Sequence, residues 1–135
     1  MIRTVALLFG VVFTLIGIAG FIPSLVQPAT EHMDVGMNHG VLLGLFPINT
    51  AHNIVHVLFG LWGLAASRSI GGSRSYFQAV AVIYILLAIM GLLPQTNTTF
   101  GLVPLYGNDV WLHAALGLVG AYFGFMHRER TSDVR

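Results

Sequence analysis

The sequence lacks cysteine and lysine altogether, and only 8% of its 135 residues are charged. Without cysteine, disulfide bonds, thiolate metal sites and cysteine nucleophiles are excluded. Without lysine, and with a net charge of +1, the chain has no basic patch to neutralise phosphates, so nucleic acid is not an expected partner. Soluble domains carry about 25% charged residues. Because 56% of this chain is hydrophobic, we expect the lipid bilayer to be its main partner.

Apolar residues gather in four segments of 18 or 19 residues, close to the length of about 20 that crosses a bilayer. The first is expected to be a retained helix rather than a signal peptide, because "GFIPSL" offers no small-x-small cleavage site. The sequence thus predicts one all-α domain over 1–135, a polytopic membrane protein with four transmembrane helices. The expected segments are 4–22, 50–67, 75–93 and 108–126.

The connection between the first two segments contains "NHGVLLGLF" at 38–46, which is too short to cross a bilayer. Its apolar character predicts a short interfacial or re-entrant helix.

Arginine lies on one side of the expected bundle: before the first segment, between the second and third, and after the fourth. The connections 23–49 and 94–107 contain none. Positively charged residues stay in the cytoplasm. Both termini, including the tail 127–135, are therefore predicted to be cytoplasmic, and the two arginine-free connections to face outward.

The second and fourth segments carry similar motifs, "GLFPINTAHNIVHVLFGLWG" at 44–63 and "GLVPLYGNDVWLHAALGLVG" at 101–120. At a constant offset of 57, seven of the twenty positions are identical, and His56 then matches His113. The ends of the first and third segments also match, as "GFIP" and "GLLP".

This pattern predicts two tandem, pseudo-symmetric helical hairpins. Repeat one covers about 4–67 and repeat two about 75–126. Both hairpins start on the same side, so their axis is expected to run along the membrane normal.

Histidine and aspartate recur at helical spacing in the two motifs. Residues four apart lie on one helix face, so His52 and His56 are expected to point the same way, as are Asp109 and His113. Ionisable groups in a membrane normally face the bundle interior. The four side chains are therefore predicted to converge in the outer half of the bundle. Three imidazoles and one carboxylate suit tetrahedral zinc, and suit copper or iron less selectively.

Neighbouring amides and two alternatives complete this hypothesis. Asn49, Asn53 and Asn108 are predicted to hydrogen-bond the metal ligands and set the histidine tautomers. In the first alternative, His56 and His113 ligate one haem iron from the two pseudo-symmetric helices. In the second, the cluster is an interhelical polar staple, with each hydrogen bond contributing about 0.6–2 kcal/mol.

The outer connection offers a separate candidate site. The stretch "EHMDVGMNHG" at 31–40 combines imidazoles with thioethers, which suits copper(I). Ordinary loop residues are the alternative interpretation, because methionine is common in apolar chains. The residues of this candidate copper site are His32, Met33, Met37 and His39.

The two motifs, "GLFPINTAHNIVHVLFGLWGLAA" and "GLVPLYGNDVWLHAALGLVG", resemble the bacterial membrane-protein family called domain of unknown function 4383, and the resemblance covers nearly the whole chain. It implies a small four-helix protein of the bacterial inner membrane and supplies no activity.

The chain shows no nucleophile with a base, phosphate loop or dinucleotide fingerprint, so an enzyme is not expected. We expect a small integral membrane protein that binds zinc, copper or iron for metal handling or sensing. The alternative is a structural or accessory membrane subunit whose polar cluster only orders the bundle. Under either interpretation, a homo-oligomer or a larger membrane complex is a possible assembly.

Overall fold

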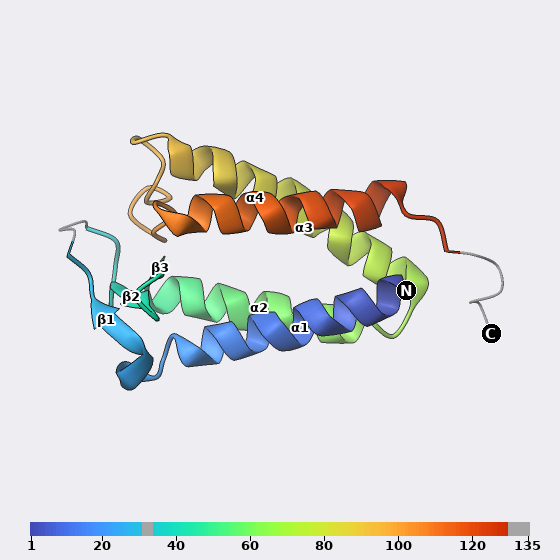
Figure 1. The fold of residues 1–135 in the computed structure, drawn as a ribbon, viewed down its shortest axis with the longest axis horizontal. Coiled ribbons are helices and arrows are strands. Elements are labelled where there is room, and N and C mark those ends of the chain that lie inside the picture. The colour runs from blue at the N-terminus through green and yellow to red at the C-terminus, as the bar shows by residue number, and fades with distance from the viewer. Residues whose placement is uncertain (31–33, 130–135) are drawn as a thin grey trace.

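Four α-helices lie side by side and form two hairpins (Figure 1). The computed structural model describes residues 1–30 and 34–129. In the first hairpin α1 packs against α2, and in the second α3 packs against α4. Each of the four predicted segments is helical. The helices are α1 (Ile2–Ala19), α2 (Thr50–Ala66), α3 (Ile70–Leu92) and α4 (Asn108–Ala121), which a π-helical turn, η2 (Tyr122–Met126), continues.

Local sequence explains where two of these helices begin. Asn49 precedes α2, and its side chain accepts a hydrogen bond from the backbone N–H of His52 at 2.8 Å. Ser69 does the same for α3, where its Oγ accepts from the N–H of Gly72 at 2.9 Å. Such caps satisfy donors that the first helical turn leaves free. α3 ends two residues before Pro94, which cannot continue a helix.

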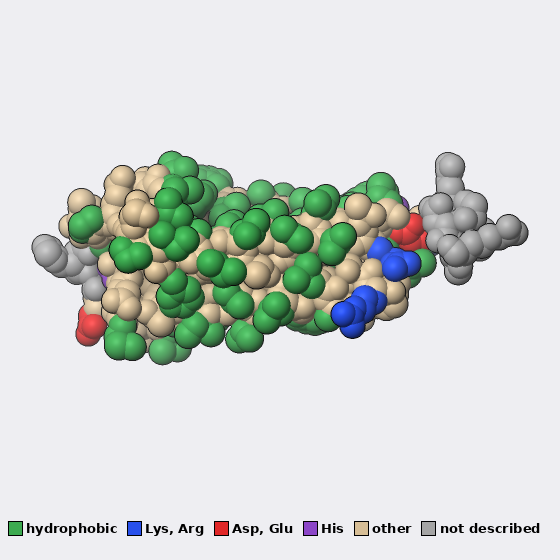
Figure 2. Space-filling model, turned by 90° about the horizontal axis from the view of Figure 1, so that it is seen from below, with side chains coloured by type: hydrophobic (Ala, Val, Ile, Leu, Met, Phe, Trp, Pro, Cys, Tyr) green, Lys and Arg blue, Asp and Glu red, His purple; other side chains and the backbone are tan. Residues whose placement is uncertain are grey.

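The outward surface of the bundle is apolar along its length. Three helical segments are long and apolar enough to cross a membrane: α1, α3 and 108–126. α2 is shorter, at 17 residues. Figure 2 shows hydrophobic side chains spread over the visible face, with charged side chains near the two ends. Continuous apolar surface of this kind suits contact with lipid, and the chain is a membrane protein. Every helix exposes large aliphatic side chains, for example Leu8, Leu58, Val82 and Leu118.

A small antiparallel sheet closes one end of the bundle (Figure 1). A 3₁₀ turn, η1 (Pro23–Leu25), leads from α1 into it. β2 lies in the middle, with Gly40 opposite Ile48 on one side and Leu42 opposite Val26 on the other. The predicted helix at 38–46 is therefore wrong. The strands are β1 (Val26–Pro28), β2 (Gly40–Leu42) and β3 (Phe46–Ile48).

Backbone conformation explains why this stretch forms strands. Leu43 and Gly44 have φ angles of 54° and 69°, which turn the chain between β2 and β3 and interrupt any helix. A Cβ atom on Gly40 would lie 2.5 Å from Cγ1 of Val26. The absence of a side chain at Gly40 thus lets β1 approach β2.

Aromatic side chains join the two hairpins. Phe9 of α1 meets Phe77 of α3 edge-on, with ring centroids 5.2 Å apart. Phe13 stacks on Tyr84 at 5.6 Å with an interplanar angle of 20°. Such pairs add about 0.5–1.5 kcal/mol to the free energy of burial. They fix α1 against α3 next to the cluster described below.

The end of the bundle opposite the sheet carries arginine and holds both ends of the described chain. Arg3 donates from Nε to the carbonyl of Ser67 at 2.9 Å, and Arg74 donates to the carbonyl of His127 at 3.1 Å. Glu129 Oε1 accepts a hydrogen bond from the backbone N–H of Ile2 at 2.6 Å. These contacts tie the loop between α2 and α3, the start of α1 and the segment after η2 together.

Acidification should weaken this junction. The hydrogen bond from Ile2 holds the pKa of Glu129 below its ordinary value of 4.5. A lowered folded-state pKa means that the stabilisation is complete above the unfolded value and is lost as pH falls through the folded value. We expect the thermal stability of the wild type in detergent to fall more between pH 6 and pH 3 than that of Glu129→Gln. Equal pH dependence of the two proteins would contradict a stabilising role for the hydrogen bond between Ile2 and Glu129.

Candidate metal centre

Two histidines of the candidate site lie on α2. The Asn49 cap sets the start of this helix, so that His52 and His56 fall in its first two turns. Their ring centroids are 4.4 Å apart, as expected for residues four apart on one face. Both are buried, with 6% and 4% of their surface exposed. The first helical hairpin therefore presents two imidazoles to the interior.

The third histidine comes from the second hairpin. His113 of α4 is 2% exposed. One ligating atom from each of His52, His56 and His113 can be chosen so that all three lie within 4.8 Å of one another. The structure thus brings together three imidazoles from two helices that are far apart in the sequence.

Two aromatic side chains flank this histidine cluster, and the sequence analysis did not identify them. Phe13 lies beside His56 with ring centroids 5.4 Å apart, and Tyr84 meets His113 edge-on at 5.2 Å. A signal was present in the sequence: Phe13 and Tyr84 each lie seven residues before the first glycine of the matching "GFIP" and "GLLP" ends. Packing against these rings restricts the rotation of the imidazoles.

Asp109 adds a carboxylate at the edge of the cluster. It lies in the first turn of α4, one turn before His113, and is 1% exposed. Its Oδ2 atom is 3.8 Å from Nε2 of His52. This distance is too long for a hydrogen bond. The group whose ligating atoms lie within 4.8 Å of one another comprises the three histidines, and Asp109 lies beside it through this contact with His52.

Several polar atoms of the cluster lack hydrogen-bond partners among the described residues. Buried polar atoms are normally hydrogen-bonded, because leaving one unpaired costs about 1–3 kcal/mol. Five such atoms in one place therefore require an explanation. They are Nδ1 and Nε2 of His52, Nδ1 of His56, Nδ1 of His113 and Oδ2 of Asp109.

The three predicted supporting amides lie in different places. Asn49 donates from Nδ2 to the carbonyls of Val35 and Leu102, so its amide nitrogen is bonded to backbone oxygens. Asn108 likewise donates to the carbonyl of Leu45 at 3.1 Å. Neither of these hydrogen bonds involves an imidazole.

Asn53 lies closer to the cluster. It is 2% exposed, and its side chain approaches the His52 ring without reaching hydrogen-bonding geometry. A Cβ atom on Gly20 would lie 2.0 Å from Oδ1 of Asn53, so the glycine is what leaves room for this amide.

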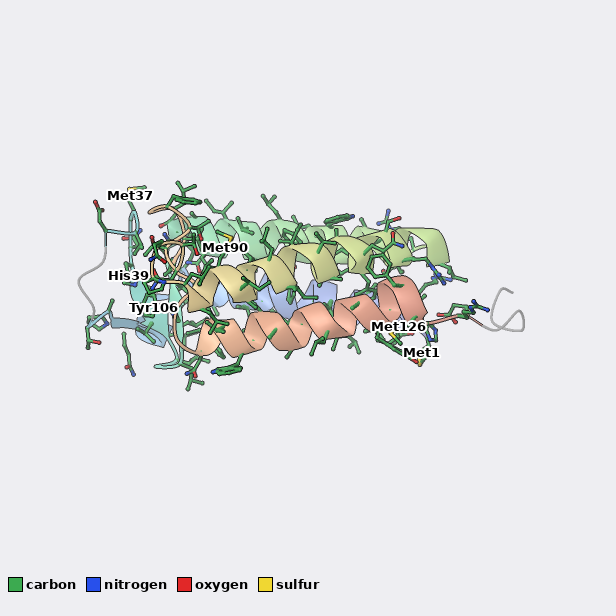
Figure 3. The ribbon with its side chains drawn as sticks, turned by 90° about the horizontal axis from the view of Figure 1, so that it is seen from above. Met1, Met37, His39, Met90, Tyr106 and Met126 are labelled. Carbon is green, nitrogen blue, oxygen red and sulfur yellow. The ribbon has the colours of Figure 1, made fainter. Side chains whose placement is uncertain are left out.

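The candidate copper site lies at the sheet end, and only part of it is described. His32 and Met33 fall outside the described residues. Met37 is 74% exposed at the edge of this end, whereas His39 lies beside Tyr106 (Figure 3). Nε2 of His39 and the hydroxyl of Tyr106 are 2.8 Å apart. The structure therefore gives His39 a tyrosine partner, which sequence reasoning did not anticipate.

A cavity of about 200 Å³ adjoins the histidine cluster. It lies between α2, α3 and the segment that precedes α4. Tyr84 and Thr99 contribute hydroxyl groups to a lining that is otherwise apolar apart from the histidines.

The fold and this cluster define a class: a helical membrane protein in which three buried histidines from two hairpins lie together, beside one buried aspartate. The chain belongs to the family described as Domain of unknown function (DUF4383), whose family model matches residues 3–126. No curated protein and no solved structure matches the chain.

Proposed function

We propose that this protein binds one transition-metal ion through His52, His56 and His113, with Asp109 as a fourth ligand, and that it handles or senses the metal in the membrane. The observation that carries the proposal is the convergence of three buried imidazoles from two helices, with ligating atoms within 4.8 Å of one another. Histidine is a common metal ligand. A bound ion would also provide a partner for buried polar atoms that otherwise have none.

The distances suit an ion after modest contraction. Three nitrogens bound to one Zn²⁺ at about 2.0–2.1 Å lie roughly 3.3 Å from one another. Since the ligating atoms lie within 4.8 Å of one another, the imidazoles need to close by at most about 1.5 Å. Imidazole also suits copper and iron, and the carboxylate of Asp109 favours zinc or iron over copper(I).

The polar staple is a weaker explanation for the same residues. A staple requires hydrogen bonds between the helices, because these supply its stabilisation. Among the described residues, the approach of His52 to Asp109 is a 3.8 Å contact, and the ring nitrogens named above have no partner. An ion accounts for these atoms, whereas a staple leaves them unpaired.

Haem is also less well supported than an ion. Ligand pockets for molecules of drug size measure about 300–1,000 Å³, and the cavity beside the cluster is about 200 Å³. A porphyrin ring between His56 and His113 would have to displace Tyr84, which packs on His113.

The test is the metal content and visible absorption of the protein purified in detergent without added metal. We expect about one zinc, copper or iron ion per chain and no Soret band. A Soret band would instead support the haem alternative. The absence of both metal and haem, after supplying each metal during growth, would leave the staple.

We further propose that the two hairpins are repeats with four membrane crossings. Gly60 lies against Thr14, where an added Cβ atom would be 2.5 Å from the backbone nitrogen. Its counterpart 57 residues later, Gly117, lies against Ile85, with a corresponding distance of 3.0 Å. Thr14 and Ile85 are related by the offset of 71 that aligns "GFIP" with "GLLP". Equivalent residues thus make equivalent contacts in the two hairpins.

The same offsets relate the aromatic contacts of the candidate centre. His56 packs against Phe13, and His113 packs against Tyr84. His56 and His113 are 57 residues apart, and Phe13 and Tyr84 are 71 residues apart. This correspondence supports a metal centre close to the axis between the hairpins.

Single-cysteine labelling tests both the orientation and the crossing by α2. The chain has no cysteine, so each variant carries one thiol. Met37→Cys lies at the sheet end and Gly71→Cys at the arginine end, with α2 between them. We place the arginine end in the cytoplasm of a bacterial cell, because positive residues stay inside. A membrane-impermeant maleimide should label Met37→Cys in intact spheroplasts and Gly71→Cys only after permeabilisation. Labelling of both from one side would show that α2 does not cross.

A further inference from the structure

Exposed apolar residues of α2 and α3 take part in lining the cavity beside the histidine cluster. Val55 of α2 and Ile83 of α3 line it and are also 42% and 36% exposed on the outer surface of the bundle. The remaining apolar wall consists of Leu87, Val103 and Leu105. In a membrane, exposed apolar side chains on the helix surfaces face acyl chains rather than water.

The cavity lies within the acyl-chain region, between the middle of α3 and one of its ends. Leu87 and Ile83 lie five and nine residues before the end of α3 at Leu92. At 1.5 Å per residue these positions are roughly 8 and 14 Å from the helix end. Since the hydrocarbon core of a bilayer is about 30 Å thick, this depth lies among the acyl chains. An uncharged molecule dissolved in the bilayer can reach it, whereas burial of a charged head there is costly.

The charge of the lining selects for a neutral ligand. Among the described residues, no arginine, aspartate or glutamate lines the cavity, so a phosphate or carboxylate head would find no cationic arginine there. The polar part of the lining, called the floor here, consists of three imidazoles with the side chains of Tyr84 and Thr99. Nδ1 of each of the three imidazoles has no hydrogen-bond partner among the described residues. A neutral imidazole offers one donor and one acceptor. Such a floor pairs with a hydroxyl or a carbonyl oxygen.

We propose that this cavity binds the head of an uncharged amphiphile dissolved in the membrane, with a hydroxyl or carbonyl oxygen on an apolar body, as in long-chain alcohols, prenols and quinones. The ligand enters between α2 and α3, and its oxygen meets the histidine floor. A volume of about 200 Å³ holds the head and leaves the tail in lipid. The inference does not require metal, and it is compatible with metal, because each imidazole has two ring nitrogens and one can hydrogen-bond the oxygen while the other binds an ion.

Photo-crosslinking of the full chain in phosphatidylcholine liposomes tests the inference. The probe is a long-chain alcohol with a diazirine near its hydroxyl group, and labelled residues are identified by mass spectrometry. We expect labelling at Val55, Ile83 and Leu87. Decylubiquinone or 1-dodecanol should reduce it at least fivefold, whereas dodecane, which lacks a head, should not.

A matched pair of variants separates the cavity from the general lipid surface. Leu87→Trp fills the cavity and should reduce labelling at Val55 at least fivefold. Leu86→Trp adds the same bulk on a neighbouring residue that is 54% exposed and outside the lining, and it should leave labelling unchanged. If Leu87→Trp does not fold, competition of decylubiquinone, 1-dodecanol and dodecane with the probe in the wild type still tests the site.

Labelling spread evenly over the exposed faces of the helices, or equal competition by dodecane, would overturn the inference. Metal content is measured in the same preparations. Metal without selective labelling removes the amphiphile site and leaves the metal centre. Selective labelling without metal removes the metal centre and leaves the amphiphile site.

Discussion

His56→Ala and His113→Ala should each abolish stoichiometric metal. Each variant removes one of three imidazoles whose ligating atoms lie within 4.8 Å of one another, and the two residues come from different hairpins. Two remaining histidines with one carboxylate hold an ion far less tightly than four ligands. Asp109→Asn should weaken binding less, because the amide keeps an oxygen near His52 but loses the charge.

His39→Ala is the matched control for these variants. His39 is a histidine at the same end of the bundle, but it pairs with Tyr106 and lies outside the cluster. Its removal should leave metal content unchanged. Only neutral imidazole coordinates a metal, so acidification should release the ion from the wild type. If the wild type, His56→Ala and His113→Ala carry the same negligible metal under all conditions, the metal-binding proposal is wrong.

Gly60→Ala should strongly destabilise the first hairpin. An added Cβ atom would lie 2.5 Å from the backbone nitrogen of Thr14 and 2.9 Å from the carbonyl oxygen of Gly10. Backbone atoms of a packed helix cannot move aside as a flexible side chain can, so α1 and α2 must separate. Overpacking in a close interface typically costs about 1–3 kcal/mol, occasionally more. We expect a loss of several degrees in the melting temperature in detergent, or loss of folded protein.

Gly71→Ala provides the comparison. Gly71 also lies in a helix, α3, and nothing lies within 4 Å of a Cβ atom added there. Alanine has the higher helix propensity, so this variant should be as stable as the wild type or slightly more stable. Equal melting temperatures for Gly60→Ala and Gly71→Ala would show that close helix approach at Gly60 contributes nothing.

The sequence predicts the helices well because their determinants are local. Four apolar segments appear as four helices, with boundaries altered where a cap extends the helix. α3 begins at Ile70 rather than at 75, since Ser69 caps a polar first turn that apolar length alone does not reveal. The wrong prediction of a helix at 38–46 arises because the determinants of this segment are not local. Its strand conformation depends on pairing with β1, more than ten residues earlier, and apolar character does not distinguish a paired strand from a helix.

The site was predictable where helical spacing determines it and not where loops do. The spacing of four residues places His52 and His56 on one helix face. Their convergence with His113 follows from the repeat, because matching motifs on two helices turn the same face to the bundle interior. The amides of Asn49 and Asn108 bond to carbonyls of distant loops. Only the folded backbone shows where those carbonyls lie.

The division of the ligands between two hairpins has a thermodynamic consequence. His52 and His56 belong to one hairpin, and Asp109 and His113 to the other, so a bound ion would act as a removable cross-link between the two halves. Linkage makes such coupling reciprocal. Whatever draws the hairpins apart, such as a change in bilayer thickness or lateral tension, would lower metal affinity by the same factor by which the ion favours their association.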